Sequence, residues 1–279
     1  MLTLDTDQLS TQEIQQYLQY AIAPRPICFA STLDLEGNVN LSPFSFFNLF
    51  SMNPPICIFS PSRRVRDNTT KHTLENIKEV PECVINIVNY NMVQQVSLSS
   101  CDYPKGINEF TKAGFTELAS ELVRPPRVAE SPIQLECIVQ EVIALGAQAG
   151  AGNLVLAEIK KIHLHESILD ASNHIDQAKL DLVARLGGDW YARITEANLF
   201  KVEKPNTKLG IGFDQLPKVI QESSLFTANE KAQLANTNIA PLLNTTNELN
   251  LSSQKIQEIK AALSNNETEL AWTIIQTLV

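Results

Sequence analysis

The chain has 279 residues, 44% of them hydrophobic and 19% charged, a composition typical of a folded protein with a substantial core. Its formal net charge of -9 argues against sequence-independent binding to nucleic acid, which requires a basic surface. No apolar run approaches the roughly 20 residues that cross a bilayer, and residues 1–20 are polar and acidic. We therefore expect a cytoplasmic protein that does not bind membranes.

The first predicted elements are a helix and a β-hairpin. Ser10 is placed to cap a helix over residues 10–20. The strand "PICFASTL" (26–33), the turn "DLEGN" and the strand "VNLS" (39–42) together predict a hairpin. A further short strand, "PPICIFSP" (54–61), is bounded by prolines.

A polar loop, "SRRVRDNTT" (62–70), leads into a second helical pattern. This pattern covers residues 71–80, and Thr69 or Thr70 is placed to form its N-cap. The apolar run "ECVINIV" (82–88) then returns to strand.

Two long alternating runs, at 133–146 and 152–169, predict an antiparallel hairpin with glycines in its turn. His163 and His165 alternate with apolar residues in the second run, so we expect both to face solvent rather than a metal. The five cysteines form no C-x-x-C pair, and most lie in apolar runs, which predicts reduced thiols that are mainly buried.

The character of the chain changes near residue 205. The segments "TANE" (227–230) and "NETE" (266–269) both match the capping box that begins a helix. We predict a mostly β domain over 1–205 and a helical extension over 206–279. Short strands joined by hairpin turns favour a mainly β fold with an antiparallel barrel over a doubly wound sheet.

Several common catalytic patterns are absent from the sequence. It contains no P-loop, no H-E-x-x-H and no G-x-S-x-G, and the glycine-rich turn "GAQAGAG" (146–152) has the wrong spacing for a dinucleotide fingerprint. Four histidines and scattered cysteines predict no metal site. We expect no catalytic acid, base or nucleophile, so that any chemistry belongs to a bound cofactor.

The most informative charged segment lies at residues 61–71. Arg63, Arg64, Arg66 and Lys71 stand there against a single acid, Asp67, directly before a predicted helix N-terminus. Both features favour an anion such as phosphate, whereas the alternative is a solvated basic loop. Nearby hydroxyls favour the phosphate; they belong to Ser60, Ser62, Thr69, Thr70 and Thr73.

A second informative segment is "NLSPFSFFNLFSMNPP" (40–55), which places small polar residues among four phenylalanines. Core packing accounts for most of the rings but least well for Ser45 and Asn48, because buried polar groups need partners. A flat ring held near 42–48 and a phosphate held at 60–73 would together bind flavin mononucleotide (FMN).

These residues resemble a known family. "APRPICFASTLDLEGNVNLSPFSFFN", "NPPICIFSP", "KHTLENI" and "CVINIV" resemble the flavin reductase-like, FMN-binding split-barrel family, which includes flavoredoxin and the flavin reductase components of two-component monooxygenases. The later "DLVARLGGDWYARI" (181–194) is similar to that family's Arg-x-Gly-Gly-x-x-Tyr segment. The resemblance extends from about residue 20 to about residue 205.

The resemblance implies a six-stranded antiparallel barrel that forms a homodimer, with FMN near the subunit interface. The residues that it assigns to FMN are Ser31, Thr32, Ser45, Phe46, Phe47, Asn48, Ser60, Arg63 or Arg64, Lys71 and Thr73. The segment "RLGGDWY" (185–191) would close over the flavin, from the same subunit or from the partner subunit. His72 departs from the family pattern, in which many relatives carry Asp at this position.

By this resemblance the protein would be an NADH- or NADPH-dependent flavin reductase. The first alternative is an FMN electron carrier, similar to flavoredoxin, that a redox protein partner reduces. The second is a binding module that has kept the barrel and lost the flavin. One fold serves several roles in this family, so the fold alone does not choose among them.

Overall fold

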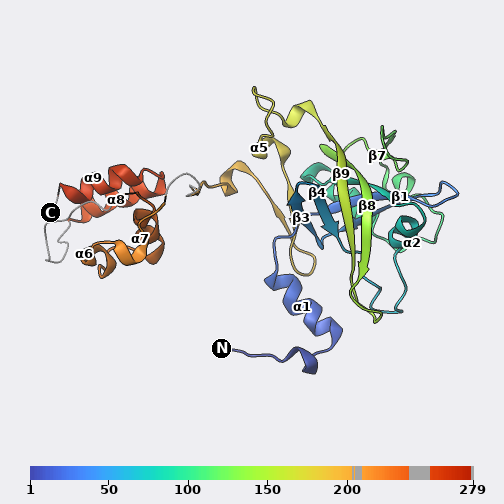
Figure 1. Cartoon of the computed structure of the whole chain (residues 1–279), viewed down its shortest axis with the longest axis horizontal. Coiled ribbons are helices and arrows are strands. Elements are labelled where there is room, and N and C mark those ends of the chain that lie inside the picture. Colours follow the sequence, from blue (N-terminus) through green and yellow to red (C-terminus); the bar gives the residue numbers. More distant parts are fainter. Residues whose placement is uncertain (203, 205–208, 239–251, 278–279) are drawn as a thin grey trace. The chain divides into compact units, whose positions relative to one another are not determined.

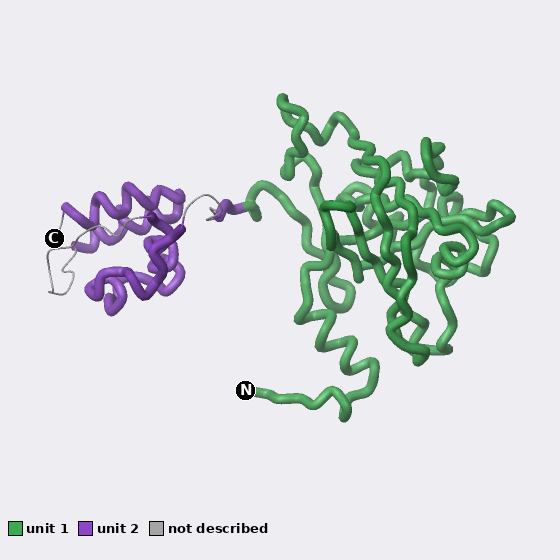
Figure 2. The backbone as a smooth tube through the Cα atoms, in the orientation of Figure 1, with its two compact units in different colours: residues 1–199 green, residues 200–279 purple. Residues whose placement is uncertain are grey.

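The computed structural model describes residues 1–202, 204, 209–238 and 252–277. The chain divides into two compact units, Met1–Leu199 and Phe200–Val279, which Figure 2 colours separately. This division falls a few residues before the domain boundary that we predicted at 205/206.

The described part of the first unit forms a seven-stranded antiparallel sheet in the order β2-β1-β5-β8-β9-β4-β3. The strands are β1 (Cys28–Leu33), β2 (Val39–Phe44), β3 (Phe47–Met52), β4 (Pro55–Phe59), β5 (Glu82–Ile87), β8 (Ile133–Ala144) and β9 (Asn153–Leu164). The mainly β, antiparallel fold is therefore as predicted, with one strand more than the resemblance implies.

Three hairpins build this sheet. β1 pairs with β2, β3 pairs with β4, and the long β8–β9 hairpin joins the other strands through β5 and β4. Figure 1 shows β8 and β9 side by side along the barrel. The hairpins predicted at 26–42 and 133–169 are confirmed.

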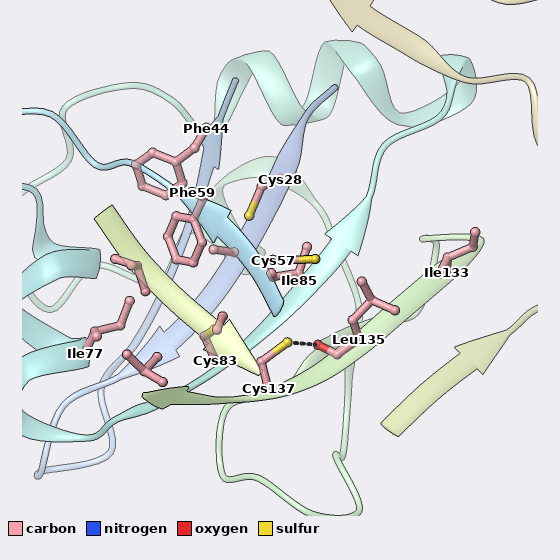
Figure 3. Packing of buried hydrophobic residues seen from close by; sticks show 14 of the residues in the cluster. Cys28, Phe44, Cys57, Phe59, Ile77, Cys83, Ile85, Ile133, Leu135 and Cys137 are labelled. Atoms are coloured by element: carbon pink, nitrogen blue, oxygen red, sulfur yellow. Dashed lines mark hydrogen bonds between the residues drawn. The ribbon is translucent and has the colours of Figure 1, made fainter. Parts of the chain in front are cut away.

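Inside the sheet lies a core that contains four cysteines, Cys28, Cys57, Cys83 and Cys137 (Figure 3). Burial raises the pKa of the Cys57 thiol to about 11 and also raises that of Cys28, so these thiols stay protonated and act as small apolar side chains. All five cysteines are free, but Cys101 is exposed, so the prediction of buried thiols holds for four of them.

A second apolar layer covers the outer face of the β1–β2 hairpin. Phe29 and Phe115 meet edge to face there, with ring centroids 5.2 Å apart, beside α3 (Val93–Leu98) and α4 (Glu109–Ala113). Because both faces of β1 are covered, all six of its residues are buried.

The helix α2 (His72–Glu79) packs on β1 and buries Leu74 and Ile77. Its N-cap is Lys71, without a side-chain capping bond, so the caps predicted at Thr69 or Thr70 are wrong. The hydroxyl of Thr70 instead donates to the Glu75 carboxylate at 2.6 Å.

At the N-terminus, α1 (Thr11–Ala21) begins with the predicted cap. Ser10 and Glu13 form a capping box in which each satisfies a backbone N–H of the other. No residue of α1 is buried, although one of its faces is apolar.

Short elements complete the first unit. They are the ribbons β6 (Glu117–Leu118) with β7 (Arg127–Val128) and β10 (Val183–Arg185) with β11 (Tyr191–Arg193), the helix α5 (Gln177–Leu180), and the 3-10 helices η1 (Thr6–Gln8), η2 (Tyr90–Met92), η3 (Glu166–Ile168) and η4 (Glu196–Asn198).

The predicted orientation of His163 is wrong. Its Nε2 lies 2.7 Å from Oε1 of Glu136, a fully buried carboxylate, while Ile162 beside it is exposed. Register shifts interrupt the β8–β9 ladder next to Glu136, so alternation along β9 does not follow one apolar face. His165, in contrast, is exposed as predicted.

The second unit is helical. Its described elements are η5 (Phe213–Gln215), α6 (Lys218–Gln221), α7 (Ala228–Ala235), α8 (Ser253–Ser264) and α9 (Thr268–Gln276), packed around a core that includes Leu234, Ile259 and Trp272. The capping box predicted at 227–230 is confirmed, with Thr227 and Glu230 exchanging bonds at the start of α7. The one predicted at 266–269 is wrong, because Glu267 is the N-cap of α9 and makes no side-chain cap.

In the described ranges of the chain, the structure has no helix both long and apolar enough to cross a bilayer.

Candidate functional site

A cleft of about 740 Å³ opens beside the end of β2. Its walls come from one face of α1, from the segment Pro43–Phe46, from the loop between Ser60 and Arg66, and from Lys71. One end of the cleft is cationic and the other is apolar.

Three cations surround one carboxylate at the cationic end. Arg64 donates from Nε to Asp102 at 3.1 Å, Arg66 approaches the same carboxylate from Nη1 at 2.8 Å, and Nζ of Lys71 lies 3.9 Å away. Arg64 also bonds to Thr69 and to the carbonyl of Thr70, which fixes its direction. Asp102 comes from the segment after α3, so the sequence run at 61–71 did not contain it.

The positive charge of this end is only partly balanced. Burial would raise the pKa of Asp102, but the bond from Arg64 and the nearby cations outweigh it and lower that pKa, so Asp102 is ionised. Burial and the charge of Arg64 lower the pKa of Lys71, because one carboxylate cannot offset its desolvation and its cationic neighbours. Counting Arg63 and Asp67 as well, four cations face two acids.

Arg63 has a structural task in the same loop. Its guanidinium bonds to the side chain and the carbonyl of Asn68, which holds the left-handed backbone conformation of that residue (φ 57°). Its backbone also pairs with Gly150 and Ala151. Of the two arginines that the sequence left open, Arg64 is therefore the one that joins the cluster around Asp102.

The apolar end is formed by Phe44, Phe46 and the face of α1 that carries Ile14, Leu18 and Ile22. Phe44 belongs to the barrel core, whereas the ring of Phe46 is exposed. The expectation that most rings of the phenylalanine-rich segment are core holds for Phe44 and Phe47 and fails for Phe46 and Phe50.

Arg25, which the sequence did not single out, connects the parts of the apolar end. Its side chain is buried and donates to the carbonyls of Gln19 and Ile22 at the end of α1, at 2.6 and 2.9 Å. It also donates from Nε to the Ser45 hydroxyl at 3.3 Å, and its guanidinium lies 6.0 Å from the ring centre of Phe46. One buried cation thus holds both α1 and Ser45 in place.

The Arg-x-Gly-Gly segment that the sequence predicted contacts both Arg25 and α1. Arg25 donates to the carbonyl of Leu186 at 2.9 Å, and the ring of Tyr20 from α1 packs on Gly187. A Cβ at Gly187 would lie 2.2 Å from the Tyr20 ring, so a larger residue there would displace the ring from this position. The segment therefore packs against α1 of its own subunit.

Ser60 lines the middle of the cleft. Its hydroxyl accepts from the backbone N–H of Asn153 at 3.1 Å, and a Cβ on Gly152 would lie 2.7 Å from its oxygen. The end of β4 and the start of β9 thus fix its position.

Several predicted site residues lie outside the cleft. Ser31 and Thr32 are fully buried in β1, where they bond to the carbonyl of Pro126 and to Asn76. Thr73 is buried and donates to Asn40 at 2.6 Å. Phe47 packs against the core, while the exposed Asn48 bonds to the next backbone N–H. The predicted contacts of these five residues with a flavin remain predictions, and the cleft does not include them.

His72, the departure from the family pattern, lines a small hollow next to the cleft rather than the cleft itself. Burial and nearby cations lower the pKa of its imidazole, against the charge of Glu75, so it is neutral at pH 7.

Sequence reasoning did not connect Arg25, Asp102 or the face of α1 with the site. The helical spacing does predict that Ile14 and Leu18 share a face, whereas no local pattern marks Asp102 or Arg25. Both matter through residues distant in sequence.

Comparisons with known proteins agree with the fold. Residues 20–179 match the family model described as flavin reductase like domain. An uncharacterized protein of Halalkalibacterium halodurans is 35% identical over 206 residues, which cover 73% of this chain and 97% of that protein.

Two solved structures are similar to the first unit. Nitrilotriacetate monooxygenase component B from Bacillus cereus is 27% identical with a TM-score of 0.67, covering 72% of this chain and 98% of that one. A split-barrel protein from Shewanella frigidimarina, described as a flavin reductase, is 25% identical with a TM-score of 0.61, covering 71% and 95%.

Proposed function

Because the chain belongs to the flavin reductase-like family, we propose that it is an oxidoreductase that binds FMN and accepts hydride from NADH or NADPH. Electrons would then pass to free flavin, to a redox protein partner or to another acceptor.

The observation that carries this proposal is the polarity of the cleft. Four cations against two acids leave two surplus positive charges at one end, which matches the charge of a phosphate monoester near neutral pH. The other end offers aromatic and aliphatic walls for a flat ring. The fit to flavin mononucleotide thus rests on this chain's own residues.

The cleft suggests a role for each group. Arg64, Arg66 and Lys71 would hold the phosphate, and the hydroxyls of Ser60 and Ser62 would face the ribityl chain. The ring would lie between Phe46 and the apolar face of α1. Ser45, held by Arg25, would face the polar edge of the ring.

When bound, the flavin supplies the redox chemistry: with one proton it takes a hydride from the nicotinamide, which leaves oxidised. The protein's task is to bind and orient the ring and to exclude water from it. No side chain of the cleft is required as a catalytic acid or base.

We also propose that the protein is a homodimer. β3 is an edge strand of the sheet, and its side chains Leu49, Phe50 and Met52 are about half or more exposed, up to 77% at Met52. An exposed apolar edge strand favours association, and a second copy of the chain would cover it. Sedimentation velocity of the wild type and of Phe50→Ser tests this: we expect a dimer that the substitution weakens, and a monomeric wild type would contradict it.

The free cysteines support a reducing compartment, and we propose the cytoplasm. Cys83 and Cys137 are opposite each other on β5 and β8 and yet remain free thiols. This arrangement is typical of proteins kept reduced.

The test of the function is a visible spectrum of the desalted protein, then anaerobic addition of NADH and of NADPH. Flavin bands that bleach with one nucleotide would establish the reductase and identify its donor. Bands that bleach only with dithionite would favour an electron carrier reduced by another protein. A protein that stays colourless after FMN is added would refute the flavin site.

A further inference from the structure

Arg25 is a buried cation whose side chain bonds only to neutral groups. Its exposed fraction is 7%. Nε donates to the hydroxyl of Ser45, and Nη2 donates to the carbonyl of Leu186. Nη1 donates to two carbonyls at the end of α1, those of Gln19 and Ile22. These hydrogen bonds fix the guanidinium without cancelling its charge, and Arg25 forms no ion pair among the described residues.

A second cation lies beside Arg25. The backbone N–H and C=O groups of Arg25 and Arg185 bond to each other at 2.8 and 2.9 Å. The guanidinium of Arg185 stacks on Tyr191, 4.6 Å from the ring centre, and it too has no ion-pair partner in the part of the chain that the structure describes. Burial and then the charge of Arg185 lower the pKa of Arg25, although an arginine keeps its charge at pH 7. The two charges therefore repel each other and are not compensated.

Arg25 lies at the end of the cleft that we assign to the flavin ring. It lines the cleft together with Ser45 and Phe46, whose ring centre is 6.0 Å from the guanidinium. Among the described residues that line the cleft, the one acid is Asp102, at the phosphate end. The Ser45 hydroxyl accepts from Arg25 and has no acceptor of its own among those residues, so its proton is free for a ligand. A buried cation thus polarises the donor that faces the ring.

Reduction changes the charge of a flavin ring. A hydride brings two electrons and one proton, so the reduced ring carries one more negative charge than the oxidised ring until a further proton neutralises it. A fixed positive charge near the ring stabilises this negative charge and leaves the neutral oxidised ring almost unaffected. The effect is largest for a cation that is buried and uncompensated, because solvent and counter-charges screen it least.

We propose that Arg25, acting through Ser45 and reinforced by Arg185, raises the reduction potential of the bound flavin. This inference rests on the proposed FMN site. Arg25 is then a positioning residue, because it acts on the ring through the Ser45 hydroxyl. A flavin of higher potential takes hydride from its donor more completely and passes electrons only to acceptors of sufficiently high potential. The two arginines would therefore limit which acceptors the protein can reduce.

The test compares the midpoint potentials of five FMN-loaded proteins: wild type, Arg25→Gln, Arg25→Lys, Arg185→Gln and Arg124→Gln. Xanthine and xanthine oxidase reduce them slowly without oxygen beside a reference dye, so no nicotinamide is needed. Arg124 is an exposed arginine outside the cleft and serves as the matched control. Arg25→Lys keeps the charge but loses the planar guanidinium and most of its bonds, so it separates charge from support of α1.

The measured quantity is the ratio of the Kd for oxidised FMN to the Kd for reduced FMN, obtained from the shift in potential relative to free FMN. We expect Arg25→Gln to lower this ratio about tenfold, which is about 30 mV for a two-electron couple. Arg185→Gln should lower it about threefold, because Arg185 acts from beside Arg25. Arg25→Lys and Arg124→Gln should stay within about twofold of wild type.

Equal potentials in wild type, Arg25→Gln and Arg185→Gln would overturn the inference, and the reductase would stand if NADH or NADPH still bleached the flavin. An equal fall in Arg25→Gln and Arg25→Lys, with no change in Arg185→Gln, would also overturn it, since lost support of α1 would then explain the fall.

If Arg25→Gln fails to fold or to bind FMN, Arg185→Gln decides, because the Arg185 side chain makes no hydrogen bond to α1 among the described residues. An unchanged ratio in that variant would then overturn the inference, and a threefold fall would support it. A wild type that binds no FMN would refute both the proposed function and this inference.

Discussion

Glu136 and Asp102 are two carboxylates of the first unit whose surroundings differ in burial and in charge balance. Glu136 is fully buried and accepts the backbone N–H groups of Glu121, Leu122 and Val123 at 2.6–3.2 Å, besides its contact with His163. Asp102 is partly exposed and lies among three cations that it cannot balance.

This difference in surroundings indicates that Glu136 has a structural role, whereas Asp102 belongs to a binding site. The carboxylate of Glu136 accepts hydrogen bonds from the backbone N–H groups of one loop. Its bonding capacity is therefore used within the protein and is not available to a ligand. Around Asp102 the cations exceed the acids, and the surplus faces an open cleft. Charge surplus in a cleft, rather than the number of charges, indicates the ligand site.

We expect the largest effect on FMN affinity when the surplus positive charge of the cleft is removed. Arg64→Ala with Lys71→Ala deletes two charge-assisted phosphate contacts of about 1.5 kcal/mol or more each. We therefore expect the Kd for FMN, measured by flavin fluorescence, to rise about 100-fold or more. Riboflavin, which lacks the phosphate, is the matched ligand and should bind both proteins alike. Wild-type FMN affinity in the double variant would place the phosphate elsewhere.

Removing the charge at the satisfied carboxylate should change stability and not binding. Glu136→Gln turns an acceptor of several donors into a buried amide with mismatched N–H groups, which should cost about 2–3 kcal/mol of unfolding free energy in urea. Glu141→Gln, on the exposed part of β8, is the control and should be near neutral. Equal stabilities for the two variants would show that the Glu136 bonds contribute little.

A smaller effect should appear in the pH dependence of the difference in unfolding free energy between wild type and Glu136→Gln. Burial would raise the pKa of Glu136, but the backbone bonds from Glu121 and Leu122 and the contact with His163 outweigh it and lower the pKa below its ordinary value of 4.5. A lowered folded-state pKa stabilises the folded state above pH 4.5, and this contribution is lost as the pH falls through the folded-state pKa. The gap between wild type and Glu136→Gln, followed by urea unfolding from pH 7 to pH 3, should therefore narrow only below pH 4.5. A gap that grows on acidification would contradict this sign.

The smallest effect should come from Asp102→Asn. This change keeps the shape of the side chain but raises the surplus of the cluster by one charge, so the Kd for FMN should fall about threefold at low salt and less at high salt. Titrations at two ionic strengths measure it. Weaker FMN binding would instead mean that Asp102 is needed to position Arg64 and Arg66.

Local patterns predicted much of the fold. Alternating apolar residues fixed the hairpins, and the Ser10 and Thr227 caps were readable because a capping box lies within four residues. The same local logic failed at His163, where register shifts next to Glu136 change which side of the strand faces inward. It also failed at Thr69 and Thr70, because their hydroxyls donate to the carboxylates of Asp67 and Glu75 and do not cap α2.

Part of the site was also predictable from local sequence. Ser45, Phe46, Ser60, Arg63, Arg64 and Lys71 line the cleft because they lie on two short segments that β4 and β3 hold side by side. Ser31, Thr32 and Thr73 have suitable hydroxyls, but burial on both faces of β1 and against Asn40 places them outside it.

By itself the sequence determined the main hairpins, the caps at Ser10 and Thr227, the family and the cationic segment, because each depends on residues near one another along the chain. Only the tertiary structure decided which charges are surplus, since Asp102 reaches the cluster and Arg25 reaches Ser45 across long sequence distances. Charge balance and burial are properties of neighbours in space, and the order of the residues does not contain them.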